Sequence, residues 1–185
     1  MTYSQAEKLQ LMMLCAIYRK LGINDSFDPE LIEEAISSDN YWALGWEYPS
    51  LDTGEEVPEN VKTFVATVDM YEILQYTYDR FSERDKAEIA SQIPYFDEAY
   101  LIKFQGFDGD HESAYIGIGR MLEKMGRLKL TAEPTRNSHR PSVDIYLRML
   151  EVFLPARAND WHEGRGISKE SFIKTLNARI HPSNR

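Results

Sequence analysis

Apolar residues recur at intervals of three and four along most of this 185-residue chain, which is the spacing of a helix that buries one face. Ser4 and Glu7 have the spacing of a capping box, in which each side chain bonds to the backbone of the other residue. A first helix is therefore predicted to about Leu21, ended by Gly22. Its apolar residues lie on opposite sides, so we expect burial on every side, by the rest of the chain or by a partner chain.

The same spacing predicts further helices. They are expected after Asp28, from 59 to about 81, from Ser82 to before Pro94, from Ala114 to Gly126, after Arg140, and from Ser168 to about Ile180. The 59–81 segment is the longest and is apolar around much of its circumference, which predicts a central helix. The chain is therefore predicted to be all-α, a multihelical array of about six to seven helices in a single domain spanning residues 1–185.

Composition indicates the compartment. The one cysteine, Cys15, lies in an apolar run, so an intrachain disulfide is excluded and an inert core thiol in a reducing compartment is expected. Met1 is followed by a polar start, and the longest apolar run is well short of the about 18 residues that a membrane span needs. These features predict a cytoplasmic protein without a signal peptide or membrane segment.

Charge is unevenly distributed along the chain, whose formal net charge is -9. Residues 24–60 hold eleven acidic residues and no Lys or Arg, whereas residues 120–140 hold six basic and two acidic residues, a net of +4. We expect such opposed segments to face solvent or each other, with binding of an acidic partner as the alternative. The acidic total argues against a duplex nucleic-acid partner, and binding through the +4 segment is the weakest function considered.

The segment 104–113 joins a glycine turn to an acidic helix start. Gly106 and Gly109 are expected to supply the positive φ of a sharp reversal. Asp108 or Asp110 can accept hydrogen bonds from the first N–H groups of the following helix, and Glu112 in its first turn suits the helix dipole. For both aspartates we expect the role of cap and turn former, with a ligand role as the alternative.

A second polar segment, 137–140, follows that helix. As a hypothesis, the Asn137 and His139 side chains lie near the start of the helix after 112 or of the one after Pro141. The alternative is that Asn137 forms a turn or cap and that His139 is solvated. The resulting candidate functional cluster comprises Asp108, Asp110, His111, Glu112, Asn137 and His139.

Known site patterns do not fit this cluster. A calcium loop that began at Asp108 would need a glycine at its sixth position and a glutamate at its twelfth, where the chain has Ser113 and Gly119. The His-Glu pairs at 111 and 162 both lack the second histidine, four residues after the first, of a zinc metalloprotease. No metal and no cofactor are therefore predicted, and no catalytic residue is assigned.

Two features predict self-association. Ser113, Gly117 and Gly119 form a small-residue side where another backbone can approach, and that backbone could belong to another protomer. The first helix and the 59–81 helix are apolar around most of their circumference. We therefore expect a homo-oligomer, a dimer or a small multiple of dimers. The aromatic stretch 41–48 is expected to be core or interface, with the wall of a small-molecule site as the alternative.

Several landmarks occur in a specific order, namely Gly106-Phe107-Asp108-Gly109 with Glu112, Met121, Gly126-Arg127, Asn137-Ser138-His139, Tyr146 and Arg148-Met149-Leu150. In this order and spacing the chain resembles the YfbU family of uncharacterised bacterial proteins, from about the first helix to the last. It departs from the family pattern in the first helix, which lacks an Asn-Gln pair, and at His111, where Asn is expected. The resemblance implies an all-helical, self-associating cytoplasmic protein and carries no established activity.

These observations favour a binding or regulatory protein that acts through its oligomeric surface, because no set of nucleophile, base and orienting residue can be identified in the sequence. The alternative is a small-molecule hydrolase with a site around Asp108, His111, Glu112 and His139. In that case His111 or His139 is the base, because histidine exchanges protons near neutral pH, and a neighbouring carboxylate orients it. Whether the chain is an enzyme is left open by the sequence.

Overall fold

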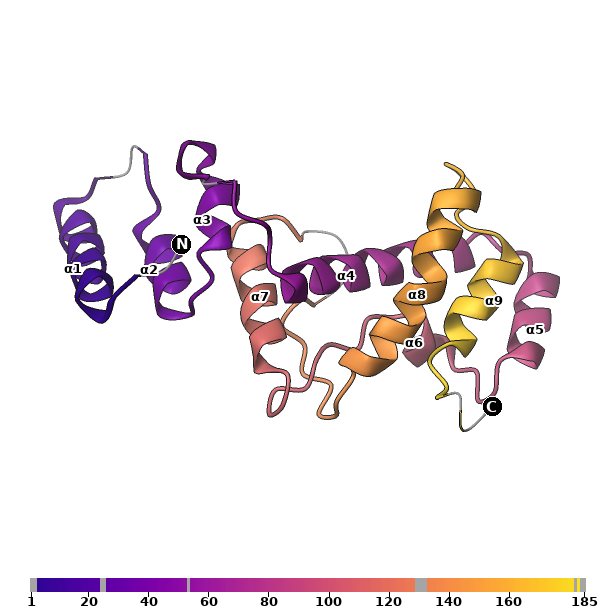
Figure 1. The fold of residues 1–185 in the computed structure, drawn as a ribbon. Coiled ribbons are helices and arrows are strands. Elements are labelled where there is room, and N and C mark those ends of the chain that lie inside the picture. The colour runs from indigo at the N-terminus through magenta and orange to yellow at the C-terminus, as the bar shows by residue number, and fades with distance from the viewer. Residues whose placement is uncertain (1–2, 24–25, 53, 129–132, 182, 184–185) are drawn as a thin grey trace.

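A computed structural model of the chain describes residues 3–23, 26–52, 54–128, 133–181 and 183. Within these residues it contains α-helices, one short 3₁₀ helix at Pro49–Leu51 and no strand, so the all-α prediction is confirmed. The helices are α1 (Gln5–Leu21), α2 (Pro29–Ser37), α3 (Trp42–Glu47), α4 (Glu59–Tyr78), α5 (Glu83–Gln92), α6 (Glu98–Leu101), α7 (Ser113–Lys124), α8 (Val143–Asp160) and α9 (Lys169–Asn177). Figure 1 shows an elongated molecule with α1 at one end and α5 and α9 at the other.

Local capping residues begin most of the predicted helices where the sequence places them. Ser4 and Glu7 form the capping box of α1, with the Glu7 N–H donating to Ser4 Oγ at 3.3 Å. Asp28, Ser82 and Ser168 each accept a backbone N–H from the first turn of α2, α5 and α9, respectively. These side chains satisfy N–H groups that a helix start leaves without partners, so the starts of these helices are set locally.

The long helix α4 runs through the middle of the molecule, as predicted (Figure 1), and residues around most of its circumference are buried, among them Phe64, Met70 and Leu74, while Asp69 and Tyr76 lie on a partly exposed side. It ends at Tyr78 rather than near 81. The N–H groups of the two residues that follow Asp79 bond to carbonyls only three residues back, at 3.1 Å each, which tightens the chain into a turn before α5.

Two apolar clusters form the core, and α7 contributes to both. Ile118 and Leu122 pack into the main cluster around α4 and α8, whereas Met121 packs with Leu31 and Leu44 in a smaller cluster beneath α2 and α3. Because α7 has one apolar face on each cluster, it fixes the position of the N-terminal helices relative to α4.

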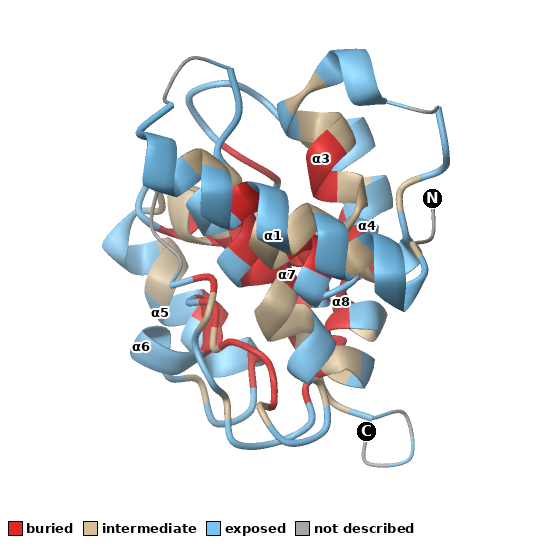
Figure 2. Cartoon of the chain, turned by 90° about the vertical axis from the view of Figure 1, so that its left-hand side faces the viewer, coloured by how far each residue is buried: buried red, intermediate tan, exposed pale blue. Residues whose placement is uncertain are grey.

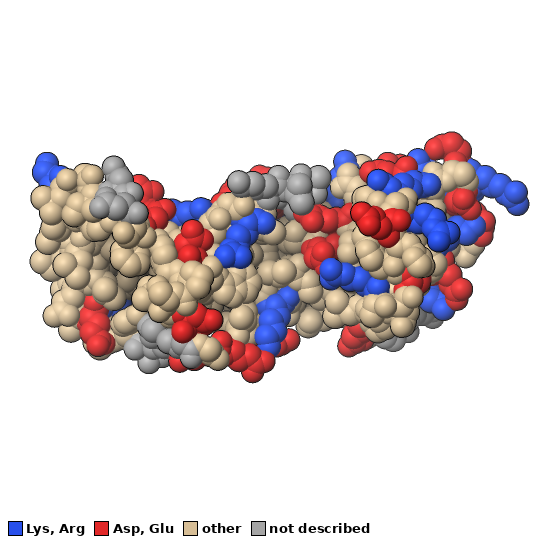
Figure 3. Space-filling view, turned by 90° about the horizontal axis from the view of Figure 1, so that it is seen from above, with Lys and Arg blue, Asp and Glu red and all other residues tan. Residues whose placement is uncertain are grey.

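The oppositely charged segments face each other. On α7, Lys124 lies 3.6 Å from a carboxylate oxygen of Glu34 on α2, and Arg120 lies 3.9 Å from the other oxygen of that carboxylate. Figure 3 shows acidic and basic side chains interspersed over much of the upper surface, without one large basic patch. The expectation that these segments pair is confirmed for α2 and α7, and the pairing reduces the charge that this part of the basic segment offers a nucleic acid.

Of the two alternatives for the burial of helix α1, the rest of the chain covers the helix on one side only. Cys15 is its one buried residue among those described, and the helix packs on α2 along that side. Figure 2 views the molecule from the α1 end and shows the outer surface of this helix largely exposed. A similar apolar pattern is therefore buried over most of α4 but leaves α1 with one apolar side in solvent.

Within the described part of the chain, no helix is both long and apolar enough to cross a membrane.

Candidate functional site

The two polar segments lie side by side. Phe107 and Asn137 form a parallel backbone bridge, in which the Phe107 N–H donates to Arg136 O at 3.2 Å and the Ser138 N–H donates to Phe107 O at 3.0 Å. Gly106 has the predicted positive φ, +89°, and a Cβ at this position would lie 1.9 Å from Arg136 O. The close approach of the second segment therefore requires glycine here.

Asn137 bonds across the two segments through its side chain. Its Oδ1 accepts the N–H of Gly109 at 3.0 Å and that of His139 at 2.8 Å. The prediction of a positive φ at Gly109 is wrong: this glycine is required by space, because a Cβ would lie 2.5 Å from Asn137 Nδ2. The Asn137 side chain thus lies beside the loop that leads into α7.

Glu112 is the link between this loop and α8. It precedes α7 without capping it, so the expectation that it sits in the first turn of that helix is wrong. Instead its carboxylate accepts the N–H of Ser142 at 2.7 Å, the N–H of Val143 at 2.9 Å and the Ser142 hydroxyl at 3.0 Å, and also the N–H of Asp108 at 2.9 Å. Glu112 therefore caps the start of α8, a helix that begins 31 residues later in the sequence.

Asp108 is buried, with 3 % of its surface exposed, and turns its carboxylate back into its own loop. Oδ1 accepts the N–H of Asp110 at 3.2 Å, and Oδ2 lies 2.7 Å from Nδ1 of His111. The prediction that Asp108 or Asp110 caps α7 is therefore wrong, although Asp108 is a turn former. The hydrogen bond to His111 lowers the pKa of Asp108, and the same bond raises the pKa of His111, whose imidazole is largely exposed.

The side chains of Asp110 and His139 are not part of this network. Both residues are exposed, and within the described chain neither side chain forms a hydrogen bond or an ion pair. His139 takes a positive φ, 55°, and its N–H is bound by Asn137. The structure thus brings together Asp108, His111, Glu112 and Asn137, and leaves the other two candidates at the edge.

Comparison with known proteins identifies the family of the chain. The model of the YfbU domain matches residues 1–174. The chain belongs to the YfbU family. It is 26% identical over 131 residues to the UPF0304 protein MJECS11 of Methanocaldococcus jannaschii, a match that covers 67% of this chain and 71% of that protein. No solved structure matches the chain. The archaeal source of this relative shows that proteins similar to the chain are not confined to bacteria.

In this YfbU chain the Asp108–His111 pair has the geometry of an oriented base, with Nδ1 held by a buried carboxylate and the ring edge in solvent. No hydroxyl or thiol of the described residues hydrogen-bonds to His111. The nearby Ser142 hydroxyl contacts Gly106 O and Glu112 instead. Nor do the described residues contain a group of three His, Cys, Asp or Glu that could hold a metal ion. The best-supported role of the cluster is to connect α7 to α8.

One glycine of the small-residue side of α7 has an explanation within the chain. A Cβ on Gly119 would lie 2.1 Å from Pro134 O and 3.0 Å from the Phe64 ring, whereas a Cβ on Gly117 would have its nearest neighbour, Asn40, at 3.8 Å. The backbone that approaches α7 at Gly119 therefore belongs to this chain, and the position of Gly117 has room for a side chain.

The aromatic stretch 41–48 forms α3 and lines a hollow of about 720 Å³. Ala43 and Leu44 are buried, which fits the core reading, while Trp42 and Trp46 are partly exposed and pack edge to face. Asp39 in the wall is bonded to both Lys8 and Tyr41. The residues of this stretch at the hollow are thus partly core and partly exposed aromatic rings, and the Asp39 carboxylate is already hydrogen-bonded.

Proposed function

We propose that this YfbU protein is a cytoplasmic, self-associating binding or regulatory module, and that two copies meet through the outer face of α1. The observation that carries the proposal is an exposed, mainly apolar face on this helix, within which Gln10 and Lys20 are the polar positions. Its members are Leu9, Met13, Leu14, Ile17 and Leu21, and they are 60%, 58%, 59%, 52% and 68% exposed. At 100° per residue these positions span about 140° of the helix, which is the width of a core-facing stripe.

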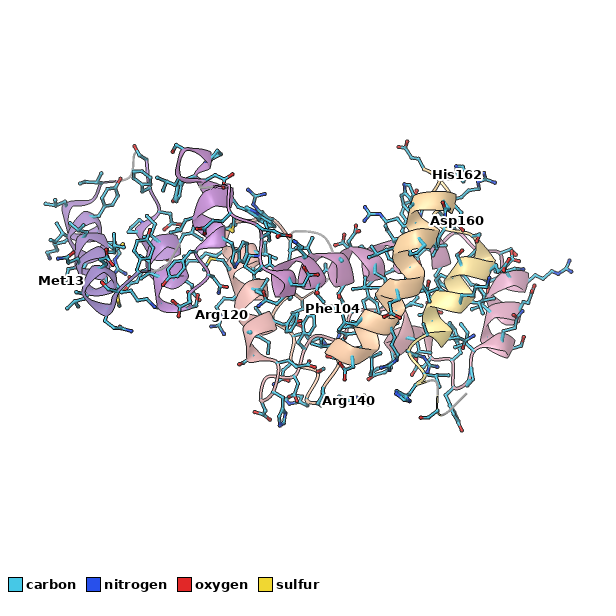
Figure 4. All side chains as sticks on the ribbon, viewed as in Figure 1. Met13, Phe104, Arg120, Arg140, Asp160 and His162 are labelled. Atoms are coloured by element: carbon cyan, nitrogen blue, oxygen red, sulfur yellow. The ribbon has the colours of Figure 1, made fainter. Side chains whose placement is uncertain are left out.

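Neighbouring structure supports an interface here. Figure 3 shows the surface over α1 mostly free of charged atoms on the side in view, and Figure 4 shows Met13 on the side of α1 that points away from α2. The chain exposes 11017 Å², against about 9,200 Å² expected for a compact monomer of this mass. An elongated chain with an exposed apolar end has surface to bury, and large apolar patches on soluble proteins mark interaction sites.

The face is also suited to a two-fold interface. A symmetric pair needs a patch that is complementary to itself, and Leu9 and Ile17 lie four residues before and after Met13. In an antiparallel pair of α1 helices centred on Met13, each Leu9 therefore meets the partner's Ile17. The two Met13 side chains meet on the axis, where the flexible thioether fills irregular space well.

Light scattering on size-exclusion fractions tests the proposal with a matched pair of substitutions. Met13→Glu places a charge in the middle of the face, and the expected result is a fall from at least twice the 21.5 kDa monomer mass to the monomer mass. Leu154→Glu places the same charge on α8, at a leucine that is 45% exposed, and should leave the mass unchanged. A wild-type monomer at micromolar concentration, or dissociation by Leu154→Glu alone, would overturn the proposal.

A hydrolase with His111 as its base is the second candidate, favoured by the 2.7 Å contact with Asp108. His139 and Glu112, the other candidates for that site, are placed as an exposed side chain and as the cap of α8. The test is the hydrolysis of p-nitrophenyl esters by the wild type and by His111→Gln. Equal rates for the two proteins would remove this candidate.

A further inference from the structure

A cavity of about 200 Å³ lies beside the 137–142 connection. Residues of α4, α6 and α8 line it. Three tyrosines and two arginines are prominent in its wall, namely Tyr71, Tyr100, Tyr146, Arg140 and Arg179. They come from five separate parts of the chain, and Figure 4 labels Arg140 on the connection that leads into α8. The cavity lies away from α1, so what it binds is independent of how the chain associates.

The charge of the cavity is opposite to that of the protein. Two arginines and no Asp or Glu are among the described residues that line it, although the chain carries a net charge of -9. Within the described residues, Arg140 and Arg179 form no ion pair with an acidic side chain. Two unpaired guanidinium groups at one small cavity favour an anion.

Arg179 is only partly satisfied by the protein. Its Nη2 donates to Pro94 O at 2.5 Å, but its Nε is buried and has no hydrogen-bond partner among the described residues. Burial also lowers the pKa of this guanidinium. A buried donor without a partner is rare and destabilising. An anion bound at the cavity would offset part of the cost of burying this positive charge.

Arg140 and Tyr71 add donors of two kinds. The Arg140 guanidinium lies over the Tyr100 ring, 5.2 Å from its centroid, and is exposed at the cavity mouth. The Tyr71 hydroxyl donates to Met149 Sδ at 3.8 Å, and a thioether sulfur is a weak acceptor. Burial raises the pKa of Tyr71 well above its ordinary value, so the hydroxyl keeps its proton at neutral pH and can donate it to a better acceptor.

The remaining walls are apolar, with Leu101, Ile145 and Met149 beside the tyrosine rings. We propose that this cavity is a binding site for a small organic carboxylate, with the carboxylate held between Arg140, Arg179 and Tyr71 and an apolar or aromatic body against the rings. A planar carboxylate matches the fork of a guanidinium. The volume corresponds to about seven water molecules in the liquid, which limits the ligand to the size of benzoate or phenylacetate.

The first test is binding to the full chain by calorimetry, with benzoate, phenylacetate and hexanoate as probes. We expect saturable binding of at least one of them, and binding of its neutral amide to be at least about tenfold weaker, because a charge-assisted hydrogen bond is lost. Three results overturn the proposal: no saturable binding of any of the three acids at millimolar concentration, equal binding of acid and amide, and equally tight binding of inorganic phosphate, which indicates a bare anion site.

Substitutions then locate the site. Arg140→Met keeps an exposed side chain of similar length, and the affinity for the carboxylate is expected to fall about tenfold. Arg127→Met is the matched control, because Arg127 also lies over an aromatic ring, with 5.4 Å to the Trp46 centroid, but does not line the cavity. Tyr71→Phe removes only the buried hydroxyl and should also weaken binding. Unchanged affinity in both Arg140→Met and Tyr71→Phe, or an equal loss in Arg127→Met, would show that the ligand binds elsewhere.

Discussion

Glu112 shows how one side chain can hold two helices in register. Its two carboxylate oxygens accept hydrogen bonds from the backbone N–H groups of Ser142 and Val143 at the start of α8, and from that of Asp108 in its own loop. Hydrogen bonds to a charged acceptor are stronger than average, and the helix start adds a favourable dipole. The polar cluster therefore stabilises the connection between the loop that leads into α7 and the start of α8.

Removal of the Glu112 carboxylate should consequently be costly. We expect Glu112→Ala to lower the free energy of unfolding by about 2 to 3 kcal/mol in urea denaturation, because several N–H groups lose their acceptor together. Glu170→Ala is the control: this exposed glutamate pairs only with Lys174 one turn on, and its loss should cost about 0.5 kcal/mol or less. A cost for Glu112→Ala as small as that of the control would show that water replaces the contact.

The Asp108–His111 pair predicts a defined pH dependence. His111 has a raised pKa, so its contribution to stability is present below its ordinary pKa and is lost as the pH rises through the raised value. Asp108 has a lowered pKa, so its contribution is present above its ordinary pKa and is lost as the pH falls through the lowered value. The pair therefore stabilises the fold fully at pH values above the ordinary pKa of an aspartate and below the ordinary pKa of a histidine.

Nuclear magnetic resonance titration of the imidazoles can check this. In Asp108→Asn the pKa of His111 should fall, because the substitution removes the carboxylate that favours the imidazolium. An unchanged His111 curve would mean that the contact is not formed in solution.

At the scale of the element, alanine substitution of the two glycines of α7 should change the free energy of unfolding in opposite directions. Gly117→Ala should raise the free energy of unfolding by about 0.5 to 1 kcal/mol, because a Cβ has space there and alanine favours the helix. Gly119→Ala should lower it by about 1 to 3 kcal/mol, because a Cβ would overlap Pro134 O. Thermal denaturation of the two variants measures both. A loss of stability in Gly117→Ala would restore the hypothesis that another chain packs on this side.

The elements that sequence reasoning could predict are those whose signals are local. The caps at Ser4, Asp28, Ser82 and Ser168 are all present, because each bonds to a backbone N–H within three residues. Helices α3 and α6 were not predicted, since six and four residues are too few to show a helical period. The role of Glu112 and the cavity between Arg140 and Arg179 depend on residues that are distant in sequence, and no local pattern marks them.

At the scale of the whole molecule, two similar apolar patterns have different surroundings. Helix α4 is covered by its own chain around most of its circumference, whereas α1 contacts α2 on one side and leaves its other side in solvent. The sequence shows that both helices are apolar on most sides, but a partner within the chain and a partner from another copy give the same pattern. The structure shows how far each helix is covered by its own chain. The exposed face of α1 is therefore the central element of the proposed self-association.

Oxidative cross-linking measures that contact most directly. In a two-fold antiparallel pair, position 13 faces its own copy, so Met13→Cys in a Cys15→Ala background should form an intermolecular disulfide that runs as a dimer on a non-reducing gel. Leu154→Cys in the same background, on the exposed side of α8, should form no disulfide and should run as a monomer on the same gel. Failure of Met13→Cys to cross-link, or equal cross-linking of Leu154→Cys, would contradict self-association through α1.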